Sequence, residues 1–321
     1  MSEEVSLSVG VPTYNQGPYI AETIESLLAQ TESPAELVVC DNFSTDGTAE
    51  ILKGFGERIR VIHPPEHLSM MANWNHLVGR LRGNWVALLS SDDLALPSYV
   101  EGLARGARSD PGAVIVRGND ELIDGEGTLL SVRKKRPLRV SRPPRNFLER
   151  LYSAKMNFNA VAFRRSAWER AGGFPESFRL LGDWALWIRM CPLGSFVTIP
   201  EYVTRYRKDH RTREQDRARI EPWARDLRAL YREVMPEVAA ELGGIPPGLV
   251  RHAMRFYCQK YLAKLSRDVP PAERAPLAAN LADWARDCAV ERELERFRAG
   301  RRFGKPRYRA LRRFAASLGL G

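Results

Sequence analysis

Two adjacent carboxylates follow a run of apolar residues in LLSSDDLALP, residues 88–97. The acids are Asp92 and Asp93, and like charges side by side repel each other unless something positive compensates them. One interpretation is a site for a divalent cation, which prefers carboxylate oxygens. The other is a helix N-cap before LALPSYVEGL, because Asp is a favoured N-cap residue.

Further polar residues follow two other apolar runs. The stretch VSLSVGV precedes Pro12, Thr13, Tyr14 and Asn15, and ELVVC precedes Asp41 and Asn42. Such runs indicate buried strands. Ligands of parallel sheets bind beyond the carboxyl ends of the strands. We therefore expect these residues and the acid pair to lie at one ligand site.

The elements that position these residues alternate between strand and helix patterns from about Val5 to Asn119. Helical spacing is clear in GPYIAETIESLLAQT and SMMANWNHLVGRL, and IRVIHPP and WVALLSSDD read as strands. This alternation predicts an α/β fold with a doubly wound, mostly parallel, Rossmann-like sheet.

The remaining chain changes character twice. The second stretch, residues 120–212, is entered through AVIVRGNDELIDGEGTLLSVR (113–133), which reads as two strands around an Asp-Gly-rich turn, and a basic loop, KKRPLRVSRPPR, follows. Residues 213–321 are mostly helical in composition. We expect one domain over 1–212, with halves 1–119 and 120–212, and a helical C-terminal region over 213–321.

Composition narrows the class of protein. Of 321 residues, 44% are hydrophobic, and the four cysteines form no CxxC pair, which favours a reducing compartment. We see no signal peptide and no segment that would span a bilayer, so we expect a soluble or peripheral protein. The net charge of +10 favours anionic partners.

Several blocks, taken in order, resemble family-2 glycosyltransferases of the GT-A fold. They are VGVPTYNQGPYIAETIESLLAQT, VVCDNFSTDGTAEIL, ANWNHLVGRLRGNWVALLSSDD, FRRSAWERAGGF, GDWALWIR and YRKDH. They cover roughly residues 5–212, and their joint order is more specific than any single block. The resemblance implies inverting, metal-dependent transfer of a sugar from a nucleotide-sugar donor.

For the donor, the resemblance implies that Asp93 binds Mn²⁺ or Mg²⁺ and that Asp92 contacts the ribose or a metal-bound water. Many relatives have Asp where this chain has Ser90. Asp41 would accept a hydrogen bond from N3–H of uracil or thymine. The further donor-binding residues that we expect are Pro12, Thr13, Tyr14, Asn15, Asn42, Asn73, Asn75 and Ser91. The alternatives are turn formation for Asp41, strand-end packing for Tyr14 and core capping for Asn73 and Asn75.

Asp183 is the expected catalytic base, taking the proton of the acceptor hydroxyl. The family usually shows Glu-Asp here, whereas this chain has Gly182 before Asp183. The alternative is an N-cap for the helix that follows, and both roles are compatible. Of Trp184 and Trp187, we expect one in the core and one in the acceptor pocket, where aromatic faces suit sugar rings.

In the segment YVTRYRKDHRTRE, two residues separate Arg207 from His210, whereas the family's usual motif, Tyr-Arg-x-His, has one. His210 is a candidate for metal or diphosphate binding, and Arg207 for the diphosphate or an anionic acceptor. The alternative is a solvated, charged loop. The C-terminal tail, which has no acid after Glu295, has the spacing of a basic amphipathic helix. It either lies on an anionic membrane or packs on the protein.

These observations predict a metal-dependent, inverting glycosyltransferase that uses a UDP- or dTDP-sugar. Its acceptor would be a hydroxyl of a glycan or lipid-linked molecule in bacterial surface polysaccharide synthesis, at the cytoplasmic face of the membrane. The helical third offers a homodimer surface. One rival class is an inactive sugar-nucleotide binder, motivated by Ser90 and Gly182. The other is a nucleotidyltransferase, but such enzymes usually have a Gly-rich loop after the first strand, and the stretch VGVPTYNQG does not contain one. We expect no nucleic-acid partner, since no RNA- or DNA-binding motif is present.

Overall fold

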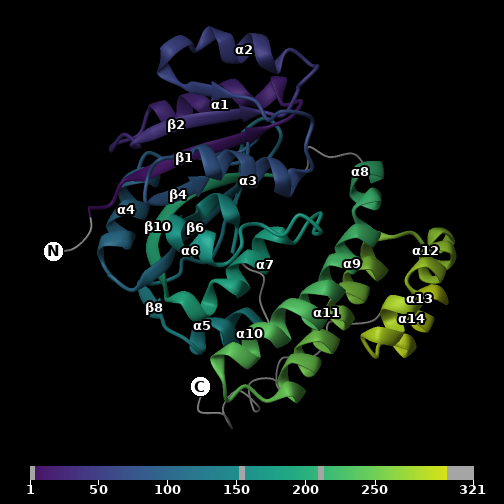
Figure 1. The fold of residues 1–321 in the computed structure, drawn as a ribbon. Helices are drawn as coiled ribbons and strands as arrows, with labels where there is room; N and C mark the ends of the chain where they lie inside the picture. Colours follow the sequence, from purple (N-terminus) through teal and green to yellow (C-terminus); the bar gives the residue numbers. More distant parts are fainter. Residues whose placement is uncertain (1–3, 152–155, 209–212, 302–321) are drawn as a thin grey trace. The chain divides into compact units, whose positions relative to one another are not determined.

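The computed structural model describes residues 4–151, 156–208 and 213–301 (Figure 1). They form two compact units. The first contains residues 4–146, 156–208 and 213–216, and the second contains residues 147–151 and 217–301. The unit boundary therefore lies close to the expected division at residue 212, but the second unit also takes a short segment from the middle of the chain.

The first unit is built on a single mixed sheet with the strand order β3-β2-β1-β4-β9-β6-β10-β5. Strand β7 pairs with β6, and β8 pairs with β10. The strands are β1 (Leu7–Thr13), β2 (Glu36–Asp41), β3 (Arg60–Ile62), β4 (Trp85–Leu88), β5 (Leu94–Ala95), β6 (Ala113–Ile123), β7 (Leu129–Val132), β8 (Arg139–Ser141), β9 (Val161–Arg164) and β10 (Ser195–Arg207).

Strands β3, β2, β1 and β4 are parallel, as the alternating pattern predicts. Strand β9 runs antiparallel to both β4 and β6, and so joins them. Strands β6 and β10 are again parallel. The predicted doubly wound α/β fold is confirmed. Its consequence for function is that β1, β2 and β4 all end at the same edge of the sheet.

The helices of the first unit lie in the connections between the strands (Figure 1). They are α1 (Gly17–Leu28), α2 (Thr48–Gly54), α3 (Met70–Arg80), α4 (Tyr99–Arg108), α6 (Arg165–Arg170) and α7 (Gly182–Arg189). Two sequence signals set their starts. Pro18 occupies the first turn of α1, where its missing N–H is not needed, and the Ser69 hydroxyl accepts a hydrogen bond from Ala72 N (3.4 Å) at the start of α3.

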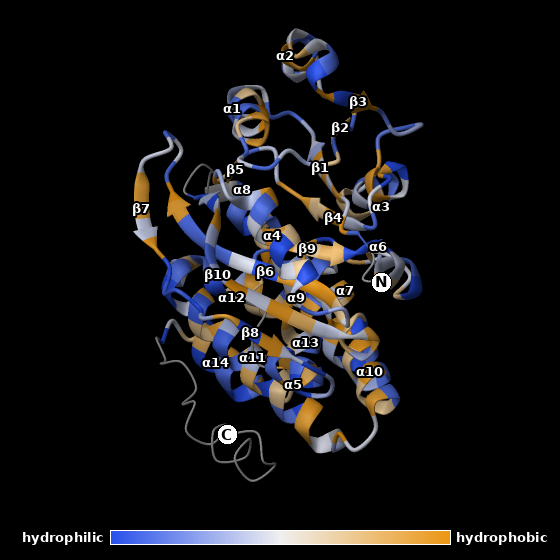
Figure 2. Cartoon of the chain, turned by 90° about the vertical axis from the view of Figure 1, so that its left-hand side faces the viewer, coloured by the Kyte–Doolittle hydropathy of each residue, from blue (hydrophilic) through white to orange (hydrophobic). Residues whose placement is uncertain are grey.

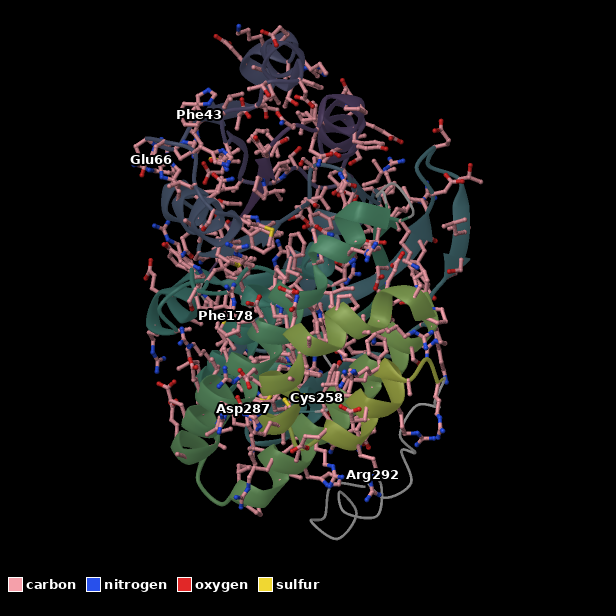
Figure 3. All side chains as sticks on the ribbon, turned by 90° about the vertical axis from the view of Figure 1, so that its right-hand side faces the viewer. Phe43, Glu66, Phe178, Cys258, Asp287 and Arg292 are labelled. Atoms are coloured by element: carbon pink, nitrogen blue, oxygen red, sulfur yellow. The ribbon has the colours of Figure 1, made fainter. Side chains whose placement is uncertain are left out.

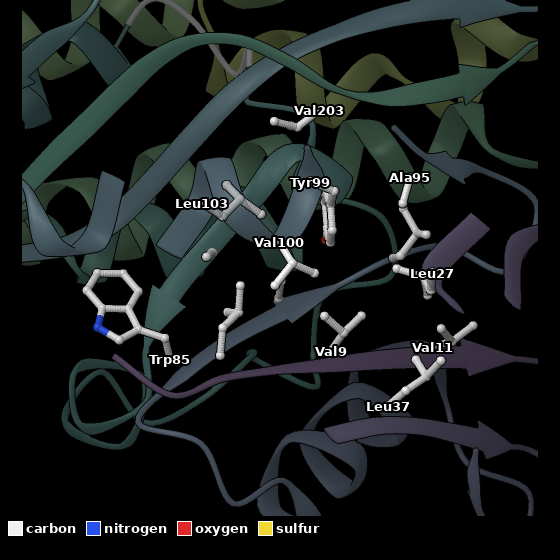
Figure 4. Close-up of a cluster of buried hydrophobic side chains, with 14 of the residues drawn as sticks. Val9, Val11, Leu27, Leu37, Trp85, Ala95, Tyr99, Val100, Leu103 and Val203 are labelled. Carbon is white, nitrogen blue, oxygen red and sulfur yellow. The ribbon is translucent and has the colours of Figure 1, made fainter. Parts of the chain in front are cut away.

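The core of the first unit lies between the sheet and helices α1 and α4 (Figure 4). Val9 and Val11 on β1 point toward Leu27 of α1 and Val100 of α4, and all four side chains are buried. Burying each such side chain stabilises the fold by about 1.5–3 kcal/mol. The buried face of α1 thus fixes the loop that precedes it, which carries Tyr14 and Asn15.

The second unit is helical, which confirms the predicted C-terminal extension. Its helices are α5 (Arg145–Leu151, which begins at the unit boundary), α9 (Ile220–Ala229), α10 (Met235–Leu242), α11 (Pro247–Asp268), α12 (Arg274–Asn280), α13 (Ala282–Asp287) and α14 (Glu291–Arg298), and α8 (Arg213–Ala218) leads into them. Among the described helices, none combines the length and apolarity needed to cross a membrane.

Candidate functional site

The loops after β1 and β2 are tied together by hydrogen bonds. Asn15 N donates to Ser44 Oγ (2.9 Å), and Thr45 N donates to Asn15 Oδ1 (2.8 Å). Asn15 itself has a φ of 52°, in the left-handed region that Asn tolerates. These bonds place the residues that follow both strands at one edge of the sheet, as the sequence predicts.

Asp41, the last residue of β2, is buried, and one of its oxygens is used internally. Oδ1 accepts hydrogen bonds from Ser44 N (3.1 Å) and Ser44 Oγ (2.6 Å). Oδ2 lies 4.0 Å from Nδ1 of His63. Only Oδ1 therefore serves the turn, and the expected contact with a pyrimidine base would fall to Oδ2.

Exposed aromatic side chains surround Asp41. Tyr14 and Phe43 are both 47% exposed, which is high for large apolar rings. The Tyr14 and His67 rings have centroids 4.7 Å apart, and Phe43 lies 6.5 Å from the His63 ring. Figure 3 labels Phe43 on the loop after β2. Together these four rings offer flat faces on which a planar base could stack.

Three of the expected donor-binding asparagines form hydrogen bonds within the protein. The Asn42 amide pairs with the backbone of Leu68 in both directions (2.9 Å each). Asn73 is buried and accepts from the Cys40 thiol (3.2 Å). The Asn75 amide exchanges hydrogen bonds with the backbone of Phe174 (both 2.8 Å). These contacts fit the core-capping alternative for Asn73 and Asn75, and show that the Asn42 side chain also has internal partners. Their donor-binding roles stay predictions.

The acid pair lies on a tight loop after β4, where Asp93 is clasped by the protein. Asp93 Oδ2 accepts a hydrogen bond from Asn159 Nδ2, and Oδ1 accepts one from Arg207 N (2.6 Å). Asn159 also accepts from Ser90 N through Oδ1 (2.7 Å). Donors from two distant parts of the chain thus stabilise the Asp93 charge, and this carboxylate shapes the loop.

Arg207 supplies a positive charge beside the acid pair, but not one available to an acceptor. Its side chain is only 1% exposed. Nε donates to the backbone oxygen of Asp92 (2.8 Å), Nη1 to that of Gly125 (2.7 Å), and Nη2 pairs with the Glu22 carboxylate (2.7 Å). We expected an acceptor or diphosphate contact, and the observed role is different because the guanidinium is saturated by these internal partners.

The acid pair is the expected metal-binding site, and that role stays a prediction. No group of three or more His, Cys, Asp or Glu side chains that could hold a metal occurs in the described residues. Each oxygen of Asp93 accepts one N–H hydrogen bond and keeps a further lone pair, so the expected metal-binding role of Asp93 stays a prediction, and Asp92 is the second candidate. Mg²⁺ is commonly held by one or two carboxylates together with substrate phosphates, so the acid pair beside a diphosphate fits.

Asp183 lies in the first turn of α7, and its Oδ1 accepts a hydrogen bond from Trp184 N (2.7 Å). Burial raises the pKa of Asp183 to about 6. A carboxylate with a pKa near neutrality is suited to accept a proton in the transition state. The N-cap of α7 is Leu181, so the N-cap alternative for Asp183 is wrong, and its hydrogen bond to Trp184 N leaves the role as base open.

The preceding residue, Gly182, is glycine for a packing reason. A Cβ built there would lie 2.1 Å from Sδ of Met71, which is buried on α3. Met71 therefore fills the space that the family's usual Glu would need. Met71 on α3 and Gly182 at the start of α7 thus pack directly against each other.

Both tryptophans of α7 are buried, so the expectation that one faces an acceptor pocket is not met. Trp187 packs against Phe163 (centroids 5.7 Å apart) and Phe174 (6.3 Å). Hydrophobic burial outweighs a surface position for these large rings. His210 lies outside the described residues.

Sequence reasoning missed three residues that build the acid loop. Asn159 binds Asp93, Glu22 pairs with Arg207, and the Thr23 hydroxyl donates to the backbone oxygens of Ser91 (3.1 Å) and Asp93 (2.9 Å). The available signals were weak. Asn159 precedes a strand in NFNAVAF, and Thr23 lies on the buried face of α1, among apolar residues.

The sequence of the chain matches a family model and several known proteins. The model described as "Glycosyl transferase family 2" matches residues 8–170, about half of the chain. Chondroitin synthase of Escherichia coli is 31% identical over 196 residues, which are 60% of this chain and 27% of that protein. Hyaluronan synthase of Pasteurella multocida is 26% identical over 193 residues, 59% of this chain and 19% of that one. The chain thus spans less than a third of the length of either synthase.

Solved structures agree on the fold. Structures of S. aureus TarS 1–349 with UDP and with UDP-GlcNAc align with TM-scores of 0.66 and 0.67 at 17% identity. The alignments cover 92% of this chain and 87% of the TarS chain. Both the sheet and the helical second unit are therefore included in the shared fold. From the matched family model, the order of its blocks along the sheet and this fold, the chain belongs to glycosyl transferase family 2.

Proposed function

We propose that the protein transfers a sugar from a UDP- or dTDP-sugar to a hydroxyl group of a glycan or lipid-linked acceptor. The observation that carries this proposal is the joint placement of Asp41, Tyr14 and Asp92 at the carboxyl ends of β2, β1 and β4. Asp41 offers Oδ2 to a pyrimidine N3–H, and the exposed rings of Tyr14 and Phe43 offer stacking faces. The TarS complexes with UDP and UDP-GlcNAc support this donor class.

The reaction that these residues support is a single displacement with inversion at the anomeric carbon. The acceptor oxygen attacks that carbon while its bond to the diphosphate breaks, and the bonding electrons leave with the nucleoside diphosphate. Asp183 takes the hydroxyl proton, which becomes acidic as the new bond forms. No second carboxylate is required as a nucleophile, so the loss of the acidic neighbour at Gly182 leaves this step intact.

Mn²⁺ or Mg²⁺, held by Asp93 or Asp92 with His210 as a further candidate, would neutralise the charge that develops on the leaving diphosphate. The chain's own contribution is a loop of fixed shape. Asn159 and the Arg207 N–H hold Asp93, and the Arg207 guanidinium holds the Asp92 backbone oxygen. Asp92 is thereby presented on a loop that does not need to reorganise when the donor binds.

We further propose a role in bacterial surface polysaccharide synthesis at the cytoplasmic face of the membrane. The matched synthases make polysaccharides, as their names state, and the four cysteines of this chain are free, which suits a reducing compartment. A homodimer contact through the helical region stays a prediction. The basic C-terminal tail, a candidate for membrane contact, lies outside the described residues.

The test is calorimetric titration with UDP and dTDP, each with and without Mn²⁺, on the native protein and Asp92→Asn. We expect metal-dependent binding of one nucleotide that is at least tenfold weaker in the variant. Asp283→Asn, on an exposed helix of the second unit, is the matched control and should bind like the native protein. Absence of binding to both nucleotides would overturn the donor assignment. Tight binding without turnover or donor hydrolysis would instead support the inactive sugar-nucleotide binder.

A further inference from the structure

An apolar edge strand stands out on the surface of the first unit. The four large apolar side chains of residues 129–138 are strongly exposed: Leu129 49%, Leu130 49%, Val132 50% and Leu138 63%. They are four of the eight large apolar side chains that are exposed in the described residues. Figure 2 shows β7 at the sheet edge with its apolar colouring. Exposed apolar clusters and uncovered edge strands commonly mark interaction sites.

The same segment is strongly basic. Between Glu126 and Glu149 the sequence contains no acid and seven cations: Arg133, Lys134, Lys135, Arg136, Arg139, Arg142 and Arg145. Arg133 pairs with Asp120 (2.9 Å) and Arg142 with Asp110 (3.2 Å). Lys134 and Lys135 are exposed and form no ion pair within the described part of the chain. Their charges are therefore available to a partner with negative charge.

Hydrogen bonds connect the turn before this segment to the acid loop. Asp124 Oδ1 accepts hydrogen bonds from Glu126 N (3.0 Å) and Thr128 N (2.8 Å), which shape the turn between β6 and β7. Arg207 donates to Gly125 O in that turn and, through the same guanidinium, to Asp92 O in the acid loop. One buried side chain thus connects the exposed edge strand to the proposed donor site.

We propose that residues 129–138, which we call the docking segment, bind the surface of an anionic phospholipid bilayer. Leucine and valine side chains would enter the headgroup boundary, and Lys134 and Lys135 would contact the lipid phosphates. Charge decides between partners. Residues 129–138 contain four cations and no acid, so a second copy of this segment would meet like charge, whereas an anionic membrane complements it. This surface binding goes beyond glycosyl transfer and does not depend on it.

Docking would have a consequence that rests on the proposed function. The docking segment would hold the chain at the surface that carries a lipid-linked acceptor. A protein that floats free would meet such an acceptor only by diffusion to the bilayer. Membrane docking would therefore raise the local acceptor concentration for the proposed reaction.

Vesicle sedimentation with the full chain and no nucleotide tests the proposal. We expect binding to vesicles of phosphatidylglycerol and phosphatidylcholine, and little binding to phosphatidylcholine alone. Lys134→Gln with Lys135→Gln should lower the partition coefficient about 25-fold, because each cation near the surface contributes roughly fivefold. Leu130→Ser with Leu138→Ser should lower it about tenfold or more. The matched control, Lys53→Gln with Arg251→Gln, removes two charges from exposed positions elsewhere and should bind like the native protein.

Three outcomes would overturn the proposal. The first is that the native protein does not bind anionic vesicles, which would show that it has no such surface. Equal binding by the lysine variant, with loss in Arg312→Gln and Arg313→Gln, would assign the membrane contact to the C-terminal tail. A concentration-dependent dimer that the leucine variant abolishes, without vesicle binding, would assign the edge strand to a second copy. Circular dichroism and UDP titration of each variant establish that it is folded, and keep a failure here separate from a failure of the donor assignment.

Discussion

Burial of the Asp183 carboxylate favours its proposed role as a base but disfavours the folded state. As a base it needs a pKa near the working pH, and burial provides this by raising the pKa to about 6. We predict that Asp183→Asn lowers the rate of transfer about 10²–10⁴-fold while the affinity for the nucleotide stays unchanged. Activity of the native enzyme should fall as the pH drops below about 6, because the carboxylate becomes protonated. Steady-state kinetics across pH 5–8 measure this, and a flat profile would contradict the assignment.

The same burial disfavours the folded state at neutral pH. The pKa rises from 3.8 to about 6 on folding, so the folded protein binds a proton that the unfolded chain has lost between these values. The free energy of unfolding should therefore decrease as the pH rises through this window and then level off. We predict that Asp183→Asn is more stable than the native protein at pH 7.5 by about 1–2 kcal/mol, allowing for partial exposure. Urea unfolding at pH 5 and pH 7.5 measures the difference.

The two acids of the pair should respond differently to the same substitution. Asp93 accepts two N–H hydrogen bonds, so Asp93→Asn would turn an amide donor toward a donor and destabilise the fold by about 1–3 kcal/mol. Asp92→Asn should weaken metal-dependent nucleotide binding. Urea unfolding measures the effect of Asp93→Asn, and native stability of that variant would contradict the loop-shaping role of Asp93.

At the scale of elements, the contact between α3 and α7 replaces an acid of the family pattern with a packing pair. Because a Cβ at residue 182 would lie 2.1 Å from Met71 Sδ, Gly182→Ala should destabilise the fold by about 1–3 kcal/mol. Met71→Ala should also destabilise, by leaving a cavity. The double variant should be more stable than the sum of the single effects predicts, by about 1 kcal/mol or more, because the new methyl group occupies the vacated space. Strict additivity in urea unfolding would show that the two residues do not share this space.

The elements themselves were predictable because their signals are local. The buried run of β1 and the helical spacing of Ile20, Ile24 and Leu27 in α1 depend on neighbours within a few residues. The order of strand ends then placed Tyr14, Asp41 and Asp92 at one edge. The roles of the individual side chains were not local. Asp93 depends on Asn159, 66 positions away, and on Arg207, 114 positions away.

The misplaced residues follow from the same cause. Arg207 and Trp187 have side chains that serve equally well in a ligand site or in a core, and their own sequence neighbourhood does not distinguish the two. Arg207 became structural because Glu22, Gly125 and the Asp92 backbone converge on it. The Gly182 departure was visible in the sequence, but its explanation required Met71 from a helix more than 100 positions earlier.

At the scale of the whole molecule, the chain forms two compact units, and the residues of the proposed donor site all lie in the first. A ligand stabilises the unit that binds it by an amount that grows with its concentration relative to Kd, about 2.7 kcal/mol at one hundred times Kd. We predict two thermal transitions in scanning calorimetry. Saturating UDP with Mn²⁺ should raise the midpoint of one of them and leave the other in place.

Two controls make this prediction specific to the site. Asp92→Asn should lose the shift that the nucleotide causes in the native protein. AMP with Mn²⁺ should shift neither, because Asp41 Oδ2 needs an N–H donor at the pyrimidine position and the loop after β2 holds that carboxylate in place. A single transition that moves as a whole with UDP would mean that the helical unit unfolds together with the sheet. The helical unit would then contribute to the stability of the donor site, and substitutions in its core should weaken nucleotide binding.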